Sequence, residues 1–268
     1  MPLYKEQGIV LRSIKLGEAD KIVSILTQGS GKVRAVAKGI RRTNSKFGAR
    51  LEPMTHVSLL LYQGRNLDTV AQAEIVHAFR AIRSDFDLIA AGETMLEAVD
   101  KVAEEHERNV RLFLLLLAGL RSLEGGPRDP AAVAESFLLK LLSLSGFHPS
   151  LSACAVCGDP GPHERFAAGQ GGVVCDGCAG SEAGRVSQPA VRWLNSLARV
   201  DLEGAGDMTP ESVVRREARA MLYGFTEYHL DRRLRSLGLL ARQPVRTASS
   251  EPDGVTVVSE PIGSMLPS

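Results

Sequence analysis

All four cysteines of the chain lie in one short segment, at a spacing that suits a metal ion. They form two Cys-x-x-Cys pairs separated by 17 residues, and they are Cys154, Cys157, Cys175 and Cys178. Four thiolates in this pattern can surround one tetrahedral Zn²⁺. Seven glycines and prolines lie between the pairs and cannot build a hydrophobic core, so metal binding can supply the missing folding free energy. The sequence therefore predicts one bound Zn²⁺.

The predicted zinc is structural rather than catalytic. A catalytic zinc keeps one coordination position open for water, whereas four cysteines close the shell. Zinc deaminases place His-x-Glu before Pro-Cys-x-x-Cys. Here His163 and Glu164 are adjacent, and Ala153 precedes the first cysteine. Two disulfides would need an oxidising compartment, and a redox site would need one Cys-x-x-Cys pair instead of two.

A second group of residues could bind a polyanion. Five cations and one phenylalanine fall within residues 38–50, which we call the cationic loop. Lysine and arginine neutralise phosphates, and an aromatic ring can stack on an unpaired base. The alternative for Phe47 is a hydrophobic plug beneath the loop. Together with basic residues of the preceding strands, the predicted DNA-binding residues are Arg12, Lys32, Arg34, Lys38, Arg41, Arg42, Lys46, Phe47 and Arg50.

The distribution of charge agrees with this prediction. The chain has a net charge of +1, but residues 1–80 contain 13 Lys and Arg against 6 Asp and Glu. An excess of positive charge in the first third favours a polyanionic partner. The alternative is a solvated basic face on a protein that is nearly neutral as a whole. The sequence Gly31-Lys32 does not complete a phosphate-binding loop, because Val33 stands where Ser or Thr must bind Mg²⁺.

The first 80 residues read as β-strands separated by turns. β-Branched residues and polar/apolar alternation predict strands at 8–14, 21–27, 32–38, 56–62 and 67–76. Five short strands with no helical pattern between them favour the small barrel that binds oligonucleotides, the OB-fold. One face of the third strand then contains Lys32 and Arg34, because side chains alternate across a strand.

The pattern becomes helical after Ser84. Apolar residues at helical spacing predict helices at about 85–106, 110–123, 131–144, 189–197 and 209–237. Asp85 and Asp129 are expected to cap the first and third of these helices, and Pro130 suits a first helical position. The helix at 110–123 is apolar on nearly every face, so we expect it to lie at the centre of the core.

The last long helix is rich in arginine. Its arginines could continue a DNA track from the barrel, or they could hold an acidic peptide with a hydrophobic end. The alternative is that they solvate the helix and pair with neighbouring acids such as Glu217 and Glu227. The candidate partner-binding residues are Arg215, Arg216, Arg219, Arg232 and Arg233.

Several short motifs of the chain resemble one known family. They are residues 16–23 (Leu-Gly-Glu-Ala-Asp-Lys-Ile-Val), Gly31-Lys32, residues 37–42 (Ala-Lys-Gly-Ile-Arg-Arg), residues 45–48 (Ser-Lys-Phe-Gly), residues 51–53 (Leu-Glu-Pro) and the four cysteines. With this spacing the chain resembles RecO, a bacterial recombination-mediator and DNA-repair family. The resemblance covers roughly residues 1–240.

The resemblance implies a fold and a set of partners. It implies an OB-fold, a helical domain and a zinc module in a protein of the RecF pathway. It also implies binding of single- and double-stranded DNA, annealing of complementary strands, and loading of the RecA recombinase onto strands coated with single-stranded-DNA-binding protein (SSB). The implied protein partners are RecR and the acidic C-terminal tail of SSB.

We therefore expect an α+β multidomain protein: an N-terminal five-stranded OB-fold barrel followed by an α-helical domain with an inserted four-cysteine zinc module. The expected limits are 1–80 for the barrel, 81–150 and 186–242 for the helical domain, 151–185 for the zinc module and 243–268 for a disordered tail. The chain shows no signal peptide and no long apolar run, so we expect it in the bacterial cytoplasm, at the nucleoid.

Two other classes of function compete with a DNA-binding mediator. A zinc-containing nuclease would need an open metal site or clustered carboxylates, and the dense set at residues 104–107 resembles a solvated helix end. A zinc-stabilised adapter would bind an acidic partner and no DNA. The mediator hypothesis needs no catalytic residue, and we expect the protein not to be an enzyme.

Overall fold

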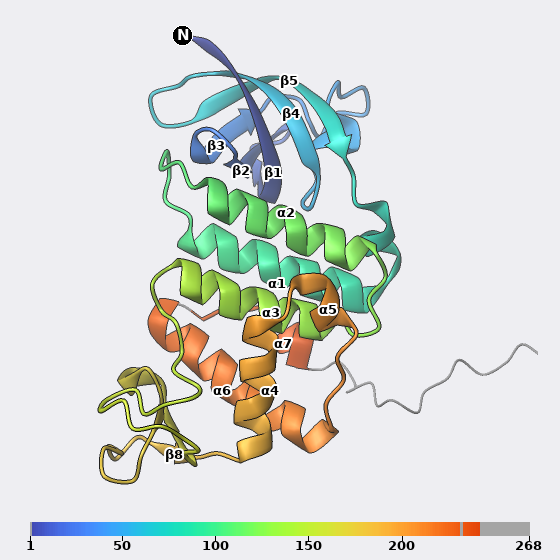
Figure 1. Cartoon of the computed structure of the whole chain (residues 1–268). Coiled ribbons are helices and arrows are strands. Elements are labelled where there is room, and N and C mark those ends of the chain that lie inside the picture. The colour runs from blue at the N-terminus through green and yellow to red at the C-terminus, as the bar shows by residue number, and fades with distance from the viewer. Residues whose placement is uncertain (1, 231–232, 242–268) are drawn as a thin grey trace, which may run out of the picture.

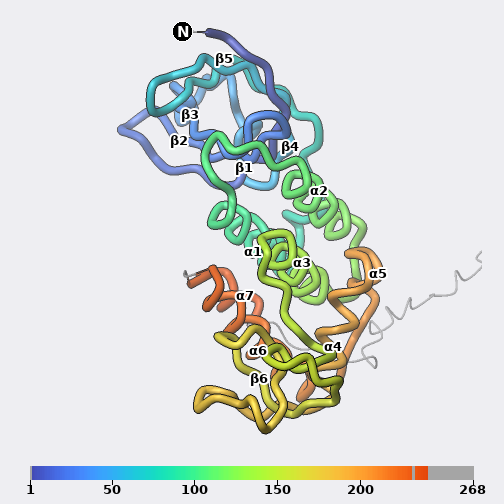
Figure 2. The backbone as a smooth tube through the Cα atoms, turned by 60° about the vertical axis from the view of Figure 1, so that its left-hand side comes forward, coloured from blue at the N-terminus to red at the C-terminus, as the bar shows by residue number. Residues whose placement is uncertain are grey.

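The computed structural model describes residues 2–230 and 233–241. A β-barrel lies at one end, helices fill the middle, and the cysteine-containing segment lies at the other end (Figures 1 and 2). The predicted tail 243–268 and the predicted binding residue Arg232 lie outside the described residues.

The N-terminal strands close into a barrel. The strands are β1 (Leu3–Leu16), β2 (Asp20–Thr27), β3 (Gly31–Ala37), β4 (His56–Tyr62) and β5 (Asp68–His77), in the order β1-β2-β3-β5-β4. The pair β3–β5 is parallel and closes the barrel, while the other neighbours are antiparallel. The predicted five-stranded barrel is confirmed, and β1 begins earlier than predicted.

The side chains of β3 alternate between the barrel core and the outer surface of the barrel. Val33 and Ala35 point into the barrel and are fully buried, whereas Lys32 and Arg34 point outward. The inward residues of all five strands form one apolar cluster. Burial on one face fixes the register, because a slip of one residue would send the charges inside.

The rest of the chain is mainly helical. The helices are α1 (Phe86–Val102), α2 (Val110–Glu124), α3 (Pro130–Leu144), α4 (Gln188–Arg199), α5 (Leu202–Gly206), α6 (Ser212–Leu230) and α7 (Leu237–Ala241). Short 3-10 turns are η1 (Gly48–Leu51), η2 (Arg80–Ser84) and η3 (Ala168–Gln170). The predicted caps are confirmed: Asp85 accepts from the backbone N of Leu88 at 3.1 Å, and Asp129 from that of Ala132 at 3.1 Å.

Between α3 and α4 the chain forms a second, small sheet that the sequence analysis did not predict. Its strands are β6 (Arg165–Ala167), β7 (Gly172–Val174) and β8 (Gly184–Arg185), in the order β7-β6-β8. We call residues 151–185 the metal module, since these strands lie among its cysteines.

The central helix is α3 and not α2, so one prediction is wrong. α3 packs against α1, α2, α4, α5 and α6, and its residues from Pro130 to Leu139 are all buried. α2 has an outer face that no described element covers, where the side chain of Leu114 is 52% exposed. An apolar run can therefore exceed what the core needs, and periodicity alone does not reveal this.

The predicted helix 209–237 is also wrong at its C-terminal end. α6 ends at Leu230, and α7 begins as a separate helix at Leu237. The carboxylate of Glu97 in α1 accepts from the backbone N of Arg235 at 3.1 Å and of Ser236 at 2.8 Å. These bonds satisfy donors at the start of α7, which supports a new helix there.

A buried network of four charged side chains joins α3 to α6. Arg215 of α6 is 1% exposed and forms ion pairs with Asp129 and Glu135. Arg219 donates to Glu135 at 2.6 Å. Burial alone would lower the pKa of Arg215, but the carboxylates of Glu135 and Asp129 outweigh it and raise that pKa. The two arginines and two carboxylates compensate one another in the interior of the protein.

Removing one member of this network should destabilise the protein strongly. Arg215→Met leaves buried carboxylates without their full set of partners, and we expect the free energy of unfolding to fall by about 3–5 kcal/mol. The measurement is urea denaturation followed by circular dichroism. Arg216→Met is the control, because the adjacent Arg216 is exposed and should change stability by less than about 0.5 kcal/mol. Equal midpoints for the two variants would contradict the assigned network.

Candidate metal centre and nucleic-acid interface

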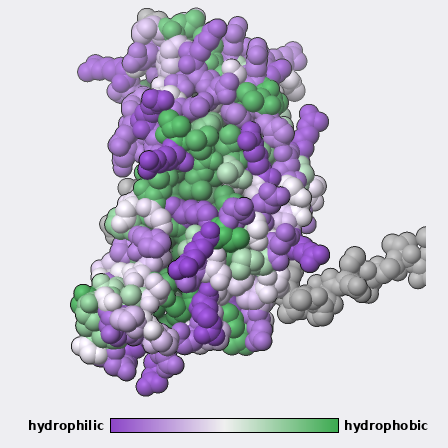
Figure 3. Space-filling model, viewed as in Figure 1, coloured by the Kyte–Doolittle hydropathy of each residue, from purple (hydrophilic) through white to green (hydrophobic). Residues whose placement is uncertain are grey.

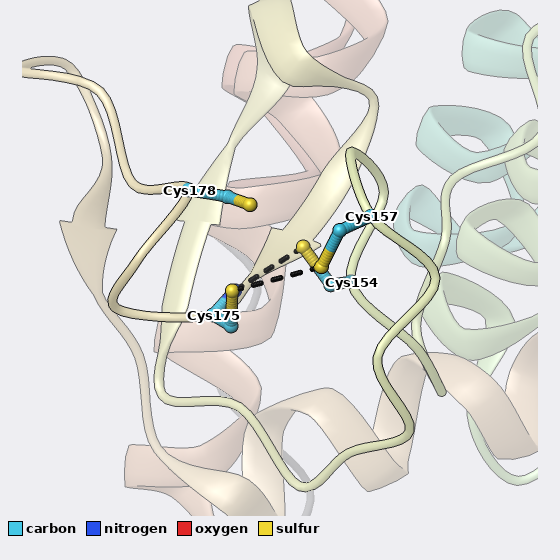
Figure 4. A group of neighbouring side chains, drawn as sticks. All are labelled: Cys154, Cys157, Cys175 and Cys178. Atoms are coloured by element: carbon cyan, nitrogen blue, oxygen red, sulfur yellow. Dashed lines mark hydrogen bonds between the residues drawn. The ribbon is translucent and has the colours of Figure 1, made fainter.

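The four cysteines converge at one point of the metal module. Their Sγ atoms all lie within 4.8 Å of one another, and those of Cys157 and Cys175 are 3.8 Å apart. A tetrahedral zinc with bonds of about 2.3 Å needs sulfur atoms about 3.8 Å apart. Figure 4 shows the side chains approaching from the two knuckles on opposite sides. The sulfur donors fit a metal ion, and they fill all four positions of a tetrahedron.

Backbone hydrogen bonds favour the thiolate form of one cysteine, which is the form that binds a cation. Backbone N–H groups of Cys157 and Cys175 lower the pKa of the Cys154 thiol to about 6, which favours the thiolate. Hydrogen bonds with the thiols of Cys175 and Cys157 raise the pKa of Cys178 to about 12. Metal binding must therefore displace protons from the cluster, as thiolate ligands require.

The metal module and the residues that lead from it into α4 are attached to α6 by three kinds of contact. The ring of Phe166 lies 6.1 Å from that of Phe225, measured between centroids. The backbone N of Ser187 donates to Glu217 at 2.6 Å. His229 donates through Nε2 to the carbonyl of Ala168 at 3.1 Å. The cysteine cluster thus fixes a segment that is packed against the helical core.

The cationic loop lies at the opposite end of the molecule, on the barrel. Lys38, Arg41 and Arg42 are exposed, and among the described residues none of them forms an ion pair with a carboxylate. The guanidinium of Arg41 donates to the carbonyl of Gly17 at 2.9 Å, which holds the loop against the β1–β2 turn. Lys46 and Arg50 are also exposed, and they donate to backbone carbonyls. The loop presents positive charge on an ordered backbone.

Phe47 does not belong to this exposed surface, which corrects its predicted role. Its side chain is 1% exposed and packs with Ile40 and Leu51 in the barrel core. The ring has no free face for a base. The alternative interpretation, a plug beneath the loop, is the one that the structure supports, because the barrel end needs apolar side chains to close it.

The three cations of the strands are separated from the loop and compensated by α1 and the segment after it, which is a second correction. Arg12 pairs with Asp100 at 2.7 Å, and Arg34 pairs with Glu105 at 3.5 Å. Lys32 donates through Nζ to the carbonyl of Asp100 at 2.7 Å. Their positive charge is thus partly compensated where the barrel meets the acidic C-terminal end of α1.

The backbone reinforces this junction between barrel and helices. The backbone N of His106 donates to the carbonyl of Lys32 at 3.0 Å. Gly31 allows this approach, because a Cβ there would lie 2.0 Å from the carbonyl oxygen of Glu107. The segment 104–107, which resembled a solvated helix end, is part of the contact.

The arginines of α6 and of the segment after it do not form one surface, which corrects the predicted partner-binding set. Arg215 and Arg219 are buried in the network with Asp129 and Glu135. Arg216 and Arg233 are exposed, and Arg233 lies 3.8 Å from Glu227. No local pattern pointed to partners from α3, because they lie 80 or more residues away along the chain.

The outer face of α2 is a surface that the sequence analysis missed. Leu114 and Ala118 are exposed on it, with Arg111 and Arg121 also exposed at its two ends. A cavity of about 840 Å³ lies between α2 and α5 and includes these apolar residues. Figure 3 shows apolar surface gathered below the barrel, where α2 runs. The signal was present as a leucine run that is longer than one buried face requires.

None of the helices in the described ranges is long and apolar enough to cross a bilayer.

Comparisons with known proteins give consistent results over nearly the whole described chain. The family model described as "Recombination protein O N terminal" matches residues 1–79, and the one described as "Recombination protein O C terminal" matches residues 83–238. The chain is 46% identical to "DNA repair protein RecO" of Frankia casuarinae over 244 residues, which cover 90% of this chain and 100% of the relative. It is 44% identical to the protein of that name from Thermobifida fusca over 244 residues, with the same coverage.

The cysteine cluster leads to a direct prediction of metal content. We expect the purified protein to contain about one metal ion per chain, because four sulfur ligands are already gathered. Cys175→Ser should lose most of this metal and lower the melting temperature. Elemental analysis of the two proteins measures the loss.

Val156→Ala is the matched control, since Val156 lies between the first two cysteines and is 57% exposed. It should keep the metal and the melting temperature. Equal metal content in Cys175→Ser and the control would show that this cluster does not hold the ion.

Proposed function

Because the chain belongs to the RecO family of DNA repair proteins, we propose that it is a recombination mediator of the RecF pathway rather than an enzyme. It binds single- and double-stranded DNA, anneals complementary strands and helps load the RecA recombinase onto SSB-coated single strands. RecR and SSB are its protein partners. The observation that supports DNA binding most directly is the ordered cationic loop with its exposed and uncompensated Lys38, Arg41 and Arg42.

The charges of the loop suit the phosphate backbone of DNA and do not distinguish one base sequence from another. Exposed cations release counterions from nucleic acid when they bind phosphates, and this contribution does not depend on sequence. In the described residues no carboxylate competes for Lys38, Arg41 or Arg42, whereas Arg12 and Arg34 are paired with Asp100 and Glu105. DNA therefore binds at the loop end of the barrel, with Lys46 and Arg50 at its margin.

Annealing requires no catalytic group. Two complementary strands repel each other through their phosphates, and lysine and arginine reduce this repulsion when they neutralise both backbones. A basic barrel surface can hold strands close enough to pair. The closed sulfur shell of the metal module agrees with this mechanism, because it leaves no coordination position for a reacting water.

The metal of the module is a single structural Zn²⁺. Four cysteine sulfurs in tetrahedral reach of one point are the donor set that zinc prefers in structural sites. When bound, the ion supplies folding free energy to a segment with little apolar core of its own. The residues that hold it are Cys154, Cys157, Cys175 and Cys178.

The acidic tail of SSB docks on the outer face of α2 instead of the arginine helix. Leu114 offers an exposed apolar contact, and Arg111 and Arg121 flank it on the same helical face. A peptide with acidic residues followed by an apolar end matches this order of charge and apolar surface. Asp201, Glu203 and Asp207 line the α5 side of the cavity and would repel an acidic peptide, so the proposed contacts are Leu114 and Arg121 on the α2 side.

DNA binding at the loop is tested by its salt dependence. We compare the wild type with Lys38→Ala/Arg41→Ala/Arg42→Ala, using fluorescence anisotropy of a labelled single strand at rising salt. Each lost phosphate contact should reduce the log–log slope by about 0.7, so the triple variant should lose about 2.

The matched control is Arg185→Ala/Arg192→Ala/Arg199→Ala, which removes three exposed arginines outside the barrel. It changes the net charge equally but should leave the slope unchanged. A loss of slope in the control alone would place DNA elsewhere. No binding by the wild type would favour the adapter hypothesis.

Peptide docking on α2 is tested with a synthetic peptide of several aspartates followed by apolar residues. Leu114→Asp and Arg121→Ala should each weaken its binding roughly tenfold, which corresponds to about 1.4 kcal/mol. Val213→Asp is the control, because Val213 is 60% exposed on α6. Isothermal titration gives the affinities, and equal weakening by Val213→Asp would count against a site on α2.

A further inference from the structure

Exposed aromatic rings gather where the metal module meets α6. Phe147 follows α3 and is 37% exposed, and Tyr228 in the last turn of α6 is 57% exposed. His229 lies between them and is half-buried. We call Phe147, Tyr228 and His229 the aromatic platform.

The three rings are in direct contact. The rings of Phe147 and His229 are stacked, with centroids 4.9 Å apart and an interplanar angle of 30°. Tyr228 meets His229 edge-on at 5.1 Å. Beneath them the buried Phe225 lies 4.2 Å from His229. Each outer ring therefore has one contact within the platform and a surface toward solvent.

The metal module holds the platform in place. The Nε2–H of His229 donates to the carbonyl of Ala168 at 3.1 Å, which fixes the middle ring. Tyr228 lies over Gly169, where a Cβ would come within 3.0 Å of the phenol oxygen. The side chain of Tyr228 can lie against the module because this position is glycine. The rings are thus ordered before any ligand arrives.

We propose that the aromatic platform is a second contact for single-stranded DNA, where unpaired bases stack on Phe147 and Tyr228. This inference rests on the proposed DNA binding and adds a site that the cationic loop does not contain. Stacking suits any base, since every base has an aromatic face, and pre-ordered rings lose little entropy on binding.

The composition of the platform favours a base over a protein partner. Its exposed surface is made of rings, and the exposed positions next to Phe147 in sequence are Gly146 and His148. Exposed aliphatic side chains lie elsewhere, such as Leu114 on α2 and Val213 on α6. Unpaired bases present flat faces that can stack on these rings, whereas the bases of a duplex already stack on one another, so duplex DNA gains nothing from this contact.

The proposal gives the metal module a role in binding. The module positions the carbonyl of Ala168 and the backbone of Gly169, which order His229 and Tyr228. Metal loss would then weaken the stacking contact while the barrel still binds phosphates. A structural metal ion thus contributes to DNA binding because it orders the aromatic platform.

The test is the affinity of full-length Phe147→Ala/Tyr228→Ala for a long single strand, measured by anisotropy at fixed salt. We expect binding about five- to 100-fold weaker than the wild type, as for a lost base–aromatic stack. The slope against salt should not change, because no charge is removed. A strand of the same length with abasic sites should bind the wild type and the variant equally.

Phe86→Ala is the matched control, because Phe86 is 63% exposed at the start of α1. It should leave the affinity unchanged. If the platform variant binds the strand as the wild type does while the loop variant loses affinity, the platform proposal is overturned and the proposed function stands. If the wild type binds no strand at all, the proposed function itself fails. If the platform variant is equally weaker on abasic and intact strands, base stacking is wrong.

Discussion

The helical part of the protein depends on a set of charges that cannot reach water. Asp129 caps the first turn of α3 and at the same time pairs with Arg215 of α6. The position of α6 is therefore tied to the start of α3 by the same carboxylate. The metal module rests on α6 through His229, and the start of α4 rests on it through Glu217, so the positions of both depend on that ion pair as well. A buried ion pair tolerates little displacement, because an unpaired charge in the interior is costly.

Ion pairs with acidic side chains also determine which basic side chains of the barrel remain available to a ligand. The barrel has basic residues on both β3 and the cationic loop, but the carboxylates at the end of α1 and just after it meet only the strand residues. Arg12 and Arg34 face Asp100 and Glu105, so their charge serves cohesion between barrel and helices. The exposed cations of the loop lie outside that contact. The positions of the acidic side chains, more than those of the basic ones, determine which positive charges remain unpaired at the surface.

Local signals in the sequence predicted the elements well. Alternation and turn residues indicated all five barrel strands, and Asp85 and Asp129 marked helix starts that side-chain hydrogen bonds confirm. Predictions that depend on distant partners failed. Lys32 meets Asp100 at a separation of 68 residues, and Arg215 meets Asp129 at 86. No pattern within a strand or helix contains such information. The strands of three residues or fewer in the metal module were missed because they are too short for a period to show.

The separation between Asp129 and Arg215 has a consequence for the order of folding during synthesis. All strands of the barrel lie between Leu3 and His77, so the ribosome delivers a complete barrel early. α1, α2 and α3 emerge next, but the face of α3 that packs against α6 and the carboxylates of Asp129 and Glu135 lack α6 until about 90 further residues have been added. The nascent chain thus passes through a stage in which all barrel strands have been made while α3 still lacks α6. Chaperones that recognise exposed leucine-rich helices would meet the protein at that stage.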